Sequence, residues 1–417
     1  MDRLKGDRCS VGKFSRVLWS SADQGLASLS NLLLSVLVAR VTSPAEFGIF
    51  AVAFTVYQFG LGSSRSFVGE PALIKLAHEA SPESRSGGVV SSSVAVGFLG
   101  FAACAVGWIF TAGESPVFLI FALSFPVLML TDGLRYYLFA VSRVRLATAI
   151  DFTWLAVQAV SYLALVTAGS NSVATVLVTW SFGALISAVF FSAALGIRPG
   201  YRQARSWITD VRGLAGRFWA EYLAISGVQQ SVIYAASAFQ GLVAAGAIRA
   251  AQVFVGPLSI MSMGVSVVAL PELSRRAKEP SKPSGLLRVS IGASGALLGV
   301  TALYATVVFL IPPEVGSALL GESWTLGQTL LPLLLTQIAV GNATYGATAG
   351  IRALQEARLS LRLRYSTAPI ALIAILIGAT QSVSGALVGA IVGSIVQFAS
   401  WWVAYCYLLK RLPEGTR

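Results

Sequence analysis

The stretches PALIKLA (71–77) and PELSRRA (271–277) stand 200 residues apart and share one register. Pro, Leu, a basic residue and Ala occupy matching positions, and each stretch follows a long apolar run. Aligned at this offset, residues 45–77 and 245–277 are identical at 8 of 33 positions. This pattern indicates a chain built from two related halves, each containing a long apolar segment that ends in a basic stretch.

The composition of the chain predicts a membrane protein. Hydrophobic residues make up 55% of its 417 residues, charged residues make up 12%, and the mean hydropathy is +0.74. A soluble domain of this size carries about twice that charged fraction. We therefore expect an all-α polytopic membrane protein.

Runs of about 18–25 apolar residues mark the expected membrane-spanning helices. They predict twelve spans in two lobes of six, with both termini on the cytoplasmic side and the eleventh span short. The expected spans are 17–39, 45–63, 88–110, 116–140, 147–168, 173–196, 218–239, 245–269, 289–311, 326–349, 366–380 and 385–409.

The distribution of basic residues tests this topology. Cytoplasmic segments of membrane proteins carry an excess of Lys and Arg. With the N-terminus inside, 28 of the 30 Lys and Arg residues fall on the inner side, and only Arg40 and Arg249 remain outside. The net charge of +12 then belongs to the cytoplasmic face. Anionic inner-leaflet lipid is its expected partner, and no nucleic acid is needed to explain it.

The expected domains follow from the spans. A basic cytoplasmic tail (1–16) precedes the N-lobe (17–196), and a linker (197–217) leads to the C-lobe (218–409), which a second cytoplasmic tail (410–417) follows. The apolar run after the first tail is long enough to be a retained span rather than a secretory signal. Two six-helix repeats that begin and end inside are parallel repeats, an arrangement found in alternating-access transporters.

The linker is predicted to be an amphipathic helix from Tyr201 onward. Trp207, Ile208, Val211 and Leu214 form one apolar stripe, and three arginines lie apart from it. Such a helix is expected to lie on the inner leaflet with its stripe toward lipid. It also serves as a simple connection between the lobes, and both interpretations can hold.

Ionisable residues inside spans are costly, so each is a candidate functional residue. Six are expected there: Asp23, Asp132, Arg135, Asp151, Glu221 and Arg249.

Arg249, one turn from Gln252, and Arg40 are the candidates for binding a diphosphate, because Arg donates in a planar, bidentate fashion. Snorkelling to lipid phosphates is the alternative for both arginines.

Asp23 lies on a polar helix face with Gln24, and a carboxylate there can bind a cation or a proton. Asp151 and Glu221 are expected in the first turns of their helices, where the helix dipole favours an acid. Asp132 and Arg135 are three residues apart and therefore face each other. A local ion pair is the expected arrangement. In the alternative, the pair lines an inward cavity, where Arg135 meets substrate phosphate and Asp132, like Glu221, serves cation or proton coupling.

The second half has a polar face of its own. Amides and phenols inside spans usually join helices, and they also suit a ligand rich in hydroxyls such as a sugar. The residues concerned are Gln229, Gln230, Tyr234, Gln337, Asn342 and Tyr345.

Catalytic and metal-binding patterns are absent from the sequence. The single histidine, His78, and three cysteines form no metal-binding pattern or external disulfide pair. We find no phosphate-binding loop or nucleophile elbow, and the longest expected outer loop has about 14 residues. We therefore expect a protein that is not an enzyme and needs no cofactor beyond a coupling H⁺ or Na⁺.

The sequence resembles the polysaccharide or O-antigen flippases of the Wzx type, in the superfamily that includes the multidrug and toxic-compound extruders. The resemblance rests on the first span, on ARVTSPAEFGIFAVAFTVYQ (39–58), and on AAQVFVGPLSIMSMGVSVVALPELSRR (250–276). It implies a V-shaped pair of six-helix lobes with the ligand between helices 1, 2, 7 and 8. The cavity residues implied by position are Asp23, Gln24, Arg40, Tyr57, Gln229, Arg249 and Gln252.

This resemblance also implies a function. Such proteins transfer polyprenyl-diphosphate-linked oligosaccharide across the bacterial cytoplasmic membrane for O-antigen, lipopolysaccharide, exopolysaccharide or capsule biosynthesis, coupled to a cation gradient. We expect a monomer whose partners are the lipid-linked oligosaccharide, anionic lipid and other polysaccharide assembly proteins. Two outer arginines are few for such a cavity.

Three other functions remain open from the sequence. A cation-coupled exporter of drugs or small solutes shares the architecture and favours an apolar cavity with an acid and few arginines. A major-facilitator transporter also has twelve spans, but GSSRSFVGEPALIKL (62–76) lacks the Asp of its usual loop motif. A membrane polysaccharide polymerase or ligase typically has a large outer loop, which this chain lacks.

Overall fold

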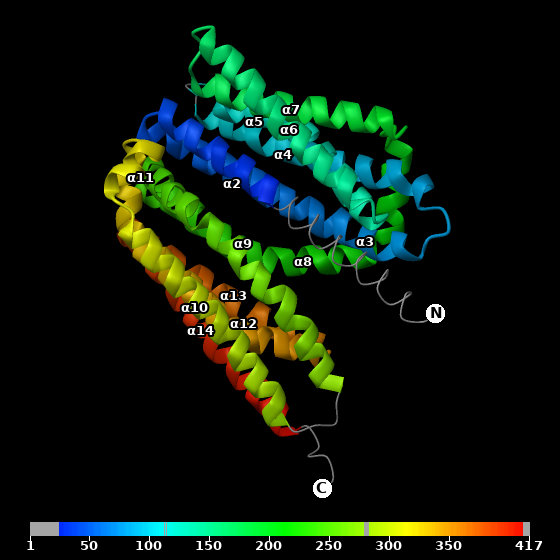
Figure 1. Cartoon of the computed structure of the whole chain (residues 1–417), viewed down its shortest axis with the longest axis vertical. Helices are drawn as coiled ribbons and strands as arrows, with labels where there is room; N and C mark the ends of the chain where they lie inside the picture. The colour runs from blue at the N-terminus through cyan, green and yellow to red at the C-terminus, as the bar shows by residue number, and fades with distance from the viewer. Residues whose placement is uncertain (1–24, 112, 114, 279–282, 412–417) are drawn as a thin grey trace, which may run out of the picture. The chain divides into compact units, whose positions relative to one another are not determined.

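The computed structural model of the chain describes residues 25–111, 113, 115–278 and 283–411, and in these ranges every regular element is a helix (Figure 1). Each of the twelve predicted spans coincides with a helix, although the described part of the first begins at Gly25. Among the described residues, eight helices are long and apolar enough to cross a membrane, and Gly25–Val41 and Leu242–Leu258 are shorter apolar helices. The all-α fold class is therefore confirmed.

The chain divides into two compact units. Residues 1–42 and 49–223 form unit 1, and residues 43–48 and 224–417 form unit 2. Unit 1 contains the helix Gly25–Val41, most of α2 (Pro44–Ser64), η1 (Arg65–Gly69), α3 (Glu70–Lys75), η2 (Leu76–His78), η3 (Pro82–Arg85), α4 (Ser86–Phe110), α5 (Val117–Ala140), α6 (Val144–Thr167), α7 (Val173–Ala194) and the first half of α8 (Tyr201–Gln240). Unit 2 contains the rest of α8, α9 (Leu242–Lys278), α10 (Pro283–Leu310), α11 (Pro313–Leu320), α12 (Ser323–Ala353), α13 (Ala357–Gln381) and α14 (Val383–Arg411).

Aromatic side chains fill the centre of unit 1. Tyr57 packs against the ring of Trp180 with centroids 5.3 Å apart, and against Phe125 at 6.1 Å. A Cβ at Gly60 would lie 2.7 Å from the Phe125 ring, so glycine is required for α2 to approach it. Stacked rings of this kind stabilise beyond the area that they bury. The result is a rigid wall behind the polar residues described below.

The linker helix differs from its prediction. Part of the stripe packs against protein: Trp207 and Val211 are 2% and 1% exposed and belong to a core cluster with α4 and α5, whereas Ile208 and Leu214 are half-buried. The backbone N–H of Gly200 donates to Ser91 at 2.8 Å, and a Cβ at Gly87 would overlap Gln203. An amphipathic pattern shows that one face of a helix is covered by an apolar surface, but it does not show whether that surface is lipid or protein. Here the small residues of α4 let protein cover part of this face.

Helix boundaries also differ from expectation at the two prolines that mark the repeat. The predicted eighth span ends near residue 269, but α9 continues through Pro271 to Lys278. The predicted second span ends at residue 63, but helical structure continues through Pro71 to His78. The eleventh span is not short, because α13 has 25 residues.

Unit 2 is held by close helix contacts at small residues. On α14, a Cβ at Gly389 would lie 2.7 Å from the backbone of Ile375, and one at Gly393 would lie 2.8 Å from Ala371. Asn342 donates to Thr301 at 2.8 Å and Gln240 donates to the carbonyl of Ala379 at 2.8 Å, so these two amides join helices. Small residues permit this approach of backbones in membrane proteins.

Replacing Gly389 with a larger residue should push α14 away from α13. We expect Gly389→Leu to lower the free energy of unfolding by about 1–3 kcal/mol, because the side chain has no space. The matched control is Gly295→Leu on α10, where no atom lies within 4 Å of the added Cβ. Melting temperatures of both variants in the same detergent measure the difference, and equal temperatures would contradict the packing.

Candidate functional site

A π-helical turn brings the first residue of the site, Arg65, into the membrane-spanning part of unit 1. In this turn the N–H of Glu70 donates to the carbonyl of Arg65, five residues back. Pro71 explains the turn, because it has no N–H to donate to Phe67 and its ring crowds that carbonyl. π-Helical turns of this type occur frequently at functional sites. Since the helix continues, Tyr57, Leu61 and Arg65 follow one another at four-residue spacing on one face.

The remaining charged residues lie on α5 and α6. Asp132 and Arg135 sit one turn apart near the end of α5, and both are buried. Asp151 is also buried and lies about two turns into α6, which begins at Val144. The sequence predicted that Asp151 lies in the first turn of its helix, at a wet interface. This prediction is wrong, because α6 begins earlier than its hydropathy indicates.

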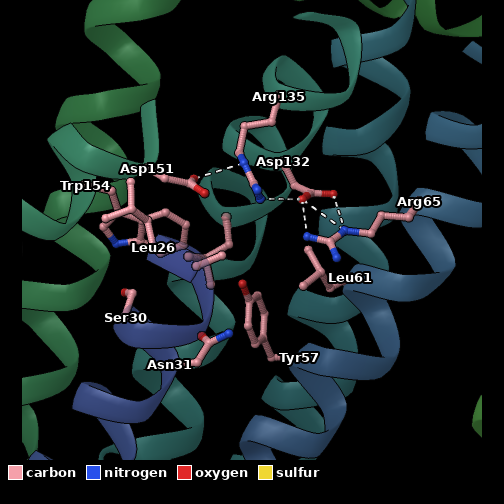
Figure 2. A pocket seen from close by; sticks show the side chains of 12 residues that line it. Leu26, Ser30, Asn31, Tyr57, Leu61, Arg65, Asp132, Arg135, Asp151 and Trp154 are labelled. Atoms are coloured by element: carbon pink, nitrogen blue, oxygen red, sulfur yellow. Dashed lines mark hydrogen bonds and ion pairs between the residues drawn. The ribbon is translucent and has the colours of Figure 1, made fainter. Parts of the chain in front are cut away.

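Four side chains form a row of alternating charge (Figure 2). Arg65 donates to Asp132 through Nη2 at 2.7 Å and through Nε at 3.1 and 3.2 Å. Arg135 Nη1 lies 3.3 Å from the same carboxylate, and Arg135 Nε lies 3.0 Å from Asp151 Oδ1. The Asp132–Arg135 ion pair expected from the sequence is thus confirmed. We call these four residues the charge row.

Exposure differs sharply along the charge row. The side chains of Asp132, Arg135 and Asp151 are 4–6% exposed, whereas that of Arg65 is 29% exposed. Arg65 also lies over the ring of Tyr136, at 5.5 Å from its centroid. The row therefore has three buried members and one cation at its accessible end.

A small pocket adjoins the charge row. Its volume is about 30 Å³, which is room for one or two water molecules. The Tyr57 hydroxyl points toward Asp132, and Asn31 lies beside Tyr57 (Figure 2). The lining residues are Leu26, Ala27, Ser30, Asn31, Tyr57, Leu61, Arg65, Leu128, Asp132, Arg135, Asp151 and Trp154. The pocket can hold water or a small cation, but it is too small for a drug or a sugar.

The charge row contains two positive and two negative side chains, so the charges of these four residues cancel. Removing charges from water is costly unless they are paired and hydrogen-bonded. Each carboxylate of the row contacts a guanidinium, and Arg135 contacts both carboxylates. Within the part of the chain that the structure describes, each acid of the row is thus paired with a guanidinium.

The structure brings together four of the candidate residues expected from the sequence, namely Tyr57, Asp132, Arg135 and Asp151. Elsewhere in unit 1, Arg40 is exposed near the end of its helix and Glu221 is half-buried on α8. Asp23 and Gln24 lie outside the described residues. In unit 2, Gln229 is exposed on α8, and Arg249 and Gln252 are half-buried on α9.

Arg65 is the residue that the sequence prediction missed. The apolar run ends near residue 63, so Arg65 was assigned to a cytoplasmic loop. The four-residue spacing from Tyr57 and Leu61 was the available signal that the helix continues. A proline six residues later argued against it, since prolines usually end helices.

Comparison with known proteins gives a clear result at the level of structure. No protein-family model matches the sequence. No curated protein matches it either. Among solved structures, an inward-facing multidrug resistance MATE family transporter of the MOP superfamily is similar, with a TM-score of 0.68 and 12% identity over 94% of this chain and 96% of that one. An outward-facing transporter of the same description has a TM-score of 0.57 and 14% identity, over 95% and 94% of the two chains.

A third similar structure is a MOP superfamily transporter from Pyrococcus furiosus, with a TM-score of 0.60 and 12% identity over 95% of this chain and 94% of that one. Its description attributes a different function to a binding pocket of reversed polarity. The chain has the fold of the MOP superfamily transporters. At these identities the likeness shows the fold and not the substrate.

Loss of the central guanidinium should destabilise unit 1. We expect Arg135→Met to lower the free energy of unfolding by about 3–5 kcal/mol, because Asp151 then lacks its guanidinium partner in a buried site. Arg143→Met, at an exposed position after α5, is the matched control and should change stability by at most about 0.5 kcal/mol. Unfolding of both variants in mixed micelles measures the effect. Equal stability would show that the charge row does not support the fold.

Proposed function

We propose that this protein is a flippase of the bacterial cytoplasmic membrane. It moves polyprenyl-diphosphate-linked oligosaccharide from the inner to the outer leaflet by alternating access, for polysaccharide biosynthesis. Two observations support transport: the fold is that of MOP superfamily transporters, and many helices are apolar enough to cross a membrane. Alternating access between two repeats is the usual mechanism of such architectures.

The charge row is the observation that favours an anionic substrate over a cationic drug. A carboxylate that attracts a cationic drug must keep its negative charge available, but Asp132 and Asp151 both contact guanidinium groups. Arg65 instead offers donors at the accessible end of the row. Guanidinium groups recognise phosphate in a bidentate manner. A diphosphate fits this arrangement better than a cation does.

The coupling ion belongs to the same proposal. Asp132 is one of the two buried acids of the described pocket, which has room for water or a small cation. Proton or sodium coupling through this acid, with Asp23 and Glu221 as further candidates, would supply the driving force. Arg40, Arg249, Gln252, Gln229 and Gln24 remain the proposed contacts for diphosphate and sugar. Anionic inner-leaflet lipid and other polysaccharide assembly proteins remain the proposed partners of a monomer.

A multidrug or small-solute exporter is the second candidate function. The observation that favours it is the description of the similar structures, which are named as multidrug resistance transporters. An exporter and a flippase of this fold differ in what accumulates when the protein is lost.

Deletion of the gene separates these two functions. We expect polyprenyl-diphosphate-linked oligosaccharides to accumulate unpolymerised in the cell while surface polysaccharide is lost. Mass spectrometry of extracted lipids and chemical assay of the surface glycan measure both pools. Unchanged pools, together with a new sensitivity to small toxic compounds, would contradict the flippase and support the exporter.

Arg249 provides a second test within the same strain. We expect Arg249→Ala to lower surface polysaccharide roughly tenfold or more, because a charged hydrogen bond to the substrate contributes about 1.5–3 kcal/mol. Arg288→Ala, at an exposed position on α10, is the matched control. Immunoblotting of membranes verifies equal insertion. Full surface polysaccharide with Arg249→Ala would remove this residue from the proposed binding site.

A further inference from the structure

We propose that the exposed face of α13 in unit 2 binds an acidic glycerophospholipid, whose phosphate is held by Arg358 and Arg362 and one of whose acyl chains lies along the apolar residues that follow. In the proposed function, anionic lipid is a general partner of the cytoplasmic face. This inference goes beyond that statement by placing one lipid molecule at named residues, and it does not depend on which substrate the protein carries.

Two exposed arginines stand side by side at the start of α13. Arg358 is the second residue of the helix, which begins at Ala357, and Arg362 follows one turn later. Side chains four residues apart are neighbours on a helix surface, with Cβ atoms about 5–6 Å apart. Both guanidinium groups can therefore reach the oxygens of one phosphate, which Arg binds in a planar, bidentate manner.

Neither arginine has an ion-pair partner in the described part of unit 2, and α13 itself contains no acidic residue. The nearby acid of α9 is already paired, because the Glu272 carboxylate contacts Arg275 at 2.8 Å and Arg276 at 2.7 Å. Glu356, directly before α13, is exposed. The face thus offers two adjacent positive charges, and an anionic headgroup complements them.

Beyond the arginines, the same face changes from polar to apolar. Tyr365 lies three residues after Arg362, so it shares this face, and its side chain is 50% exposed. Tyrosine is enriched at the level of the headgroups, where a membrane meets water. Exposed apolar residues continue along the face at helical spacing: Pro369, Leu372, Ile373 and Leu376. The sequence of cation, phenol and apolar side chains matches the sequence of phosphate, glycerol ester and acyl chain in a phospholipid.

The length of this face also matches a lipid. From Arg362 to Leu376 the helix rises about 21 Å. Half of the hydrocarbon core of a bilayer is about 15 Å thick. The face is therefore long enough to place the phosphate at headgroup level and to cover a whole acyl chain.

A contact with α14 fixes the rotation of α13. Arg364, the third arginine of α13, lies over the ring of Trp401 at 5.6 Å from its centroid, and Trp401 is fully buried. At about 100° per residue, the two exposed arginines lie more than about 100° around the helix from Arg364. The proposed lipid face is thus turned away from the surface that α14 covers.

Arg288 on α10 shows how this face differs from a lone basic residue. Arg288 is exposed, but Gly292 and Gly295 stand four and seven residues after it. A lone arginine can snorkel to any headgroup, and here no phenol or large apolar side chain follows it along the helix. Replacing Arg288 therefore removes a charge of the same kind without removing a lipid-shaped face.

Competition between lipids tests the site. The purified full chain in a neutral detergent is incubated with tritium-labelled dioleoylphosphatidylglycerol, and rapid gel filtration measures the lipid that stays bound. We expect unlabelled dioleoylphosphatidylglycerol to displace the label at a concentration roughly tenfold lower than dioleoylphosphatidylcholine, because each nearby arginine favours an anionic headgroup. Equal displacement by the two lipids in wild-type protein would overturn the site.

A double variant assigns the preference to α13. Arg358→Gln combined with Arg362→Gln should abolish it, so that both lipids displace the remaining label at similar concentrations. The matched control combines Arg143→Gln with Arg288→Gln, which removes the same charge from exposed positions elsewhere. The control should keep the wild-type preference. A preference that persists in the first variant, or that is lost equally in the control, would overturn the assignment to α13.

Wild-type protein provides a measurement that needs no variant. Raising the salt concentration from about 0.1 to about 1 M shortens the range of an exposed charge from about 10 to about 3 Å. The preference for dioleoylphosphatidylglycerol should therefore fall several-fold. A preference that does not change with salt would exclude the exposed guanidinium pair as its origin.

Two competitors separate a phospholipid from other phosphate ligands. Inorganic phosphate at millimolar concentration should not displace the label, since it has no acyl chain, and displacement would overturn the lipid in favour of a small anion. Farnesyl-diphosphoryl-N-acetylglucosamine should displace the label no better than dioleoylphosphatidylglycerol does. Much stronger displacement would overturn the phospholipid and assign the face to a lipid-linked substrate. None of these results alters the outcome of the gene deletion, so the site and the proposed function fail separately.

Discussion

The arrangement of unit 1 depends on pairing three buried ionised side chains and one partly exposed arginine inside a largely apolar lobe. Any one of them alone would be strongly destabilising there, so all four must be present and correctly spaced. Three separate helices supply them: Arg65 follows α2, Asp132 and Arg135 lie on α5, and Asp151 lies on α6. To keep these contacts, α2, α5 and α6 must hold a fixed register along one another. Apolar packing alone sets this register less strictly.

The neighbouring features of unit 1 support the same arrangement. Aromatic rings from Tyr57 to Trp180 form a wall on one side of the pocket, and glycines such as Gly60 let that wall pack closely. The linker helix fixes the other end, because Trp207 packs in the core cluster that includes residues of α5. The charge row is therefore packed against other side chains of unit 1, and Arg65 beside the π-helical turn is its most exposed member.

Much of this fold could be predicted from the sequence, because the membrane imposes long apolar runs and the basic residues gather between them. The Asp132–Arg135 pair was also predictable, since helical spacing alone brings these residues together. Asp151 was predicted as an ionisable residue inside a span, although its burial was not, and Arg65 was not predicted at all because it depends on where the helix after the second apolar run ends. Hydropathy detects where apolar residues stop, but after α2 the helical structure continues into the π-helical turn that carries Arg65, and α6 begins before its apolar run, which places Asp151 deeper in the helix. The apolar stripe of the linker was visible as well, yet periodicity does not distinguish lipid from protein as the covering surface.

The structure changes the interpretation of the two arginines that the sequence places on the outer side. Arg40 and Arg249 are few for a cavity that binds a diphosphate, but Arg65 adds a cation that hydropathy had assigned to a loop. Its charge is compensated while no substrate is present, because Asp132 holds it. A transporter must return without its substrate as well as with it, and a permanently uncompensated cation in the membrane would oppose that return. For the proposed flippase, a guanidinium paired with its own carboxylate avoids this cost, because Asp132 compensates the charge of Arg65 when no substrate is bound.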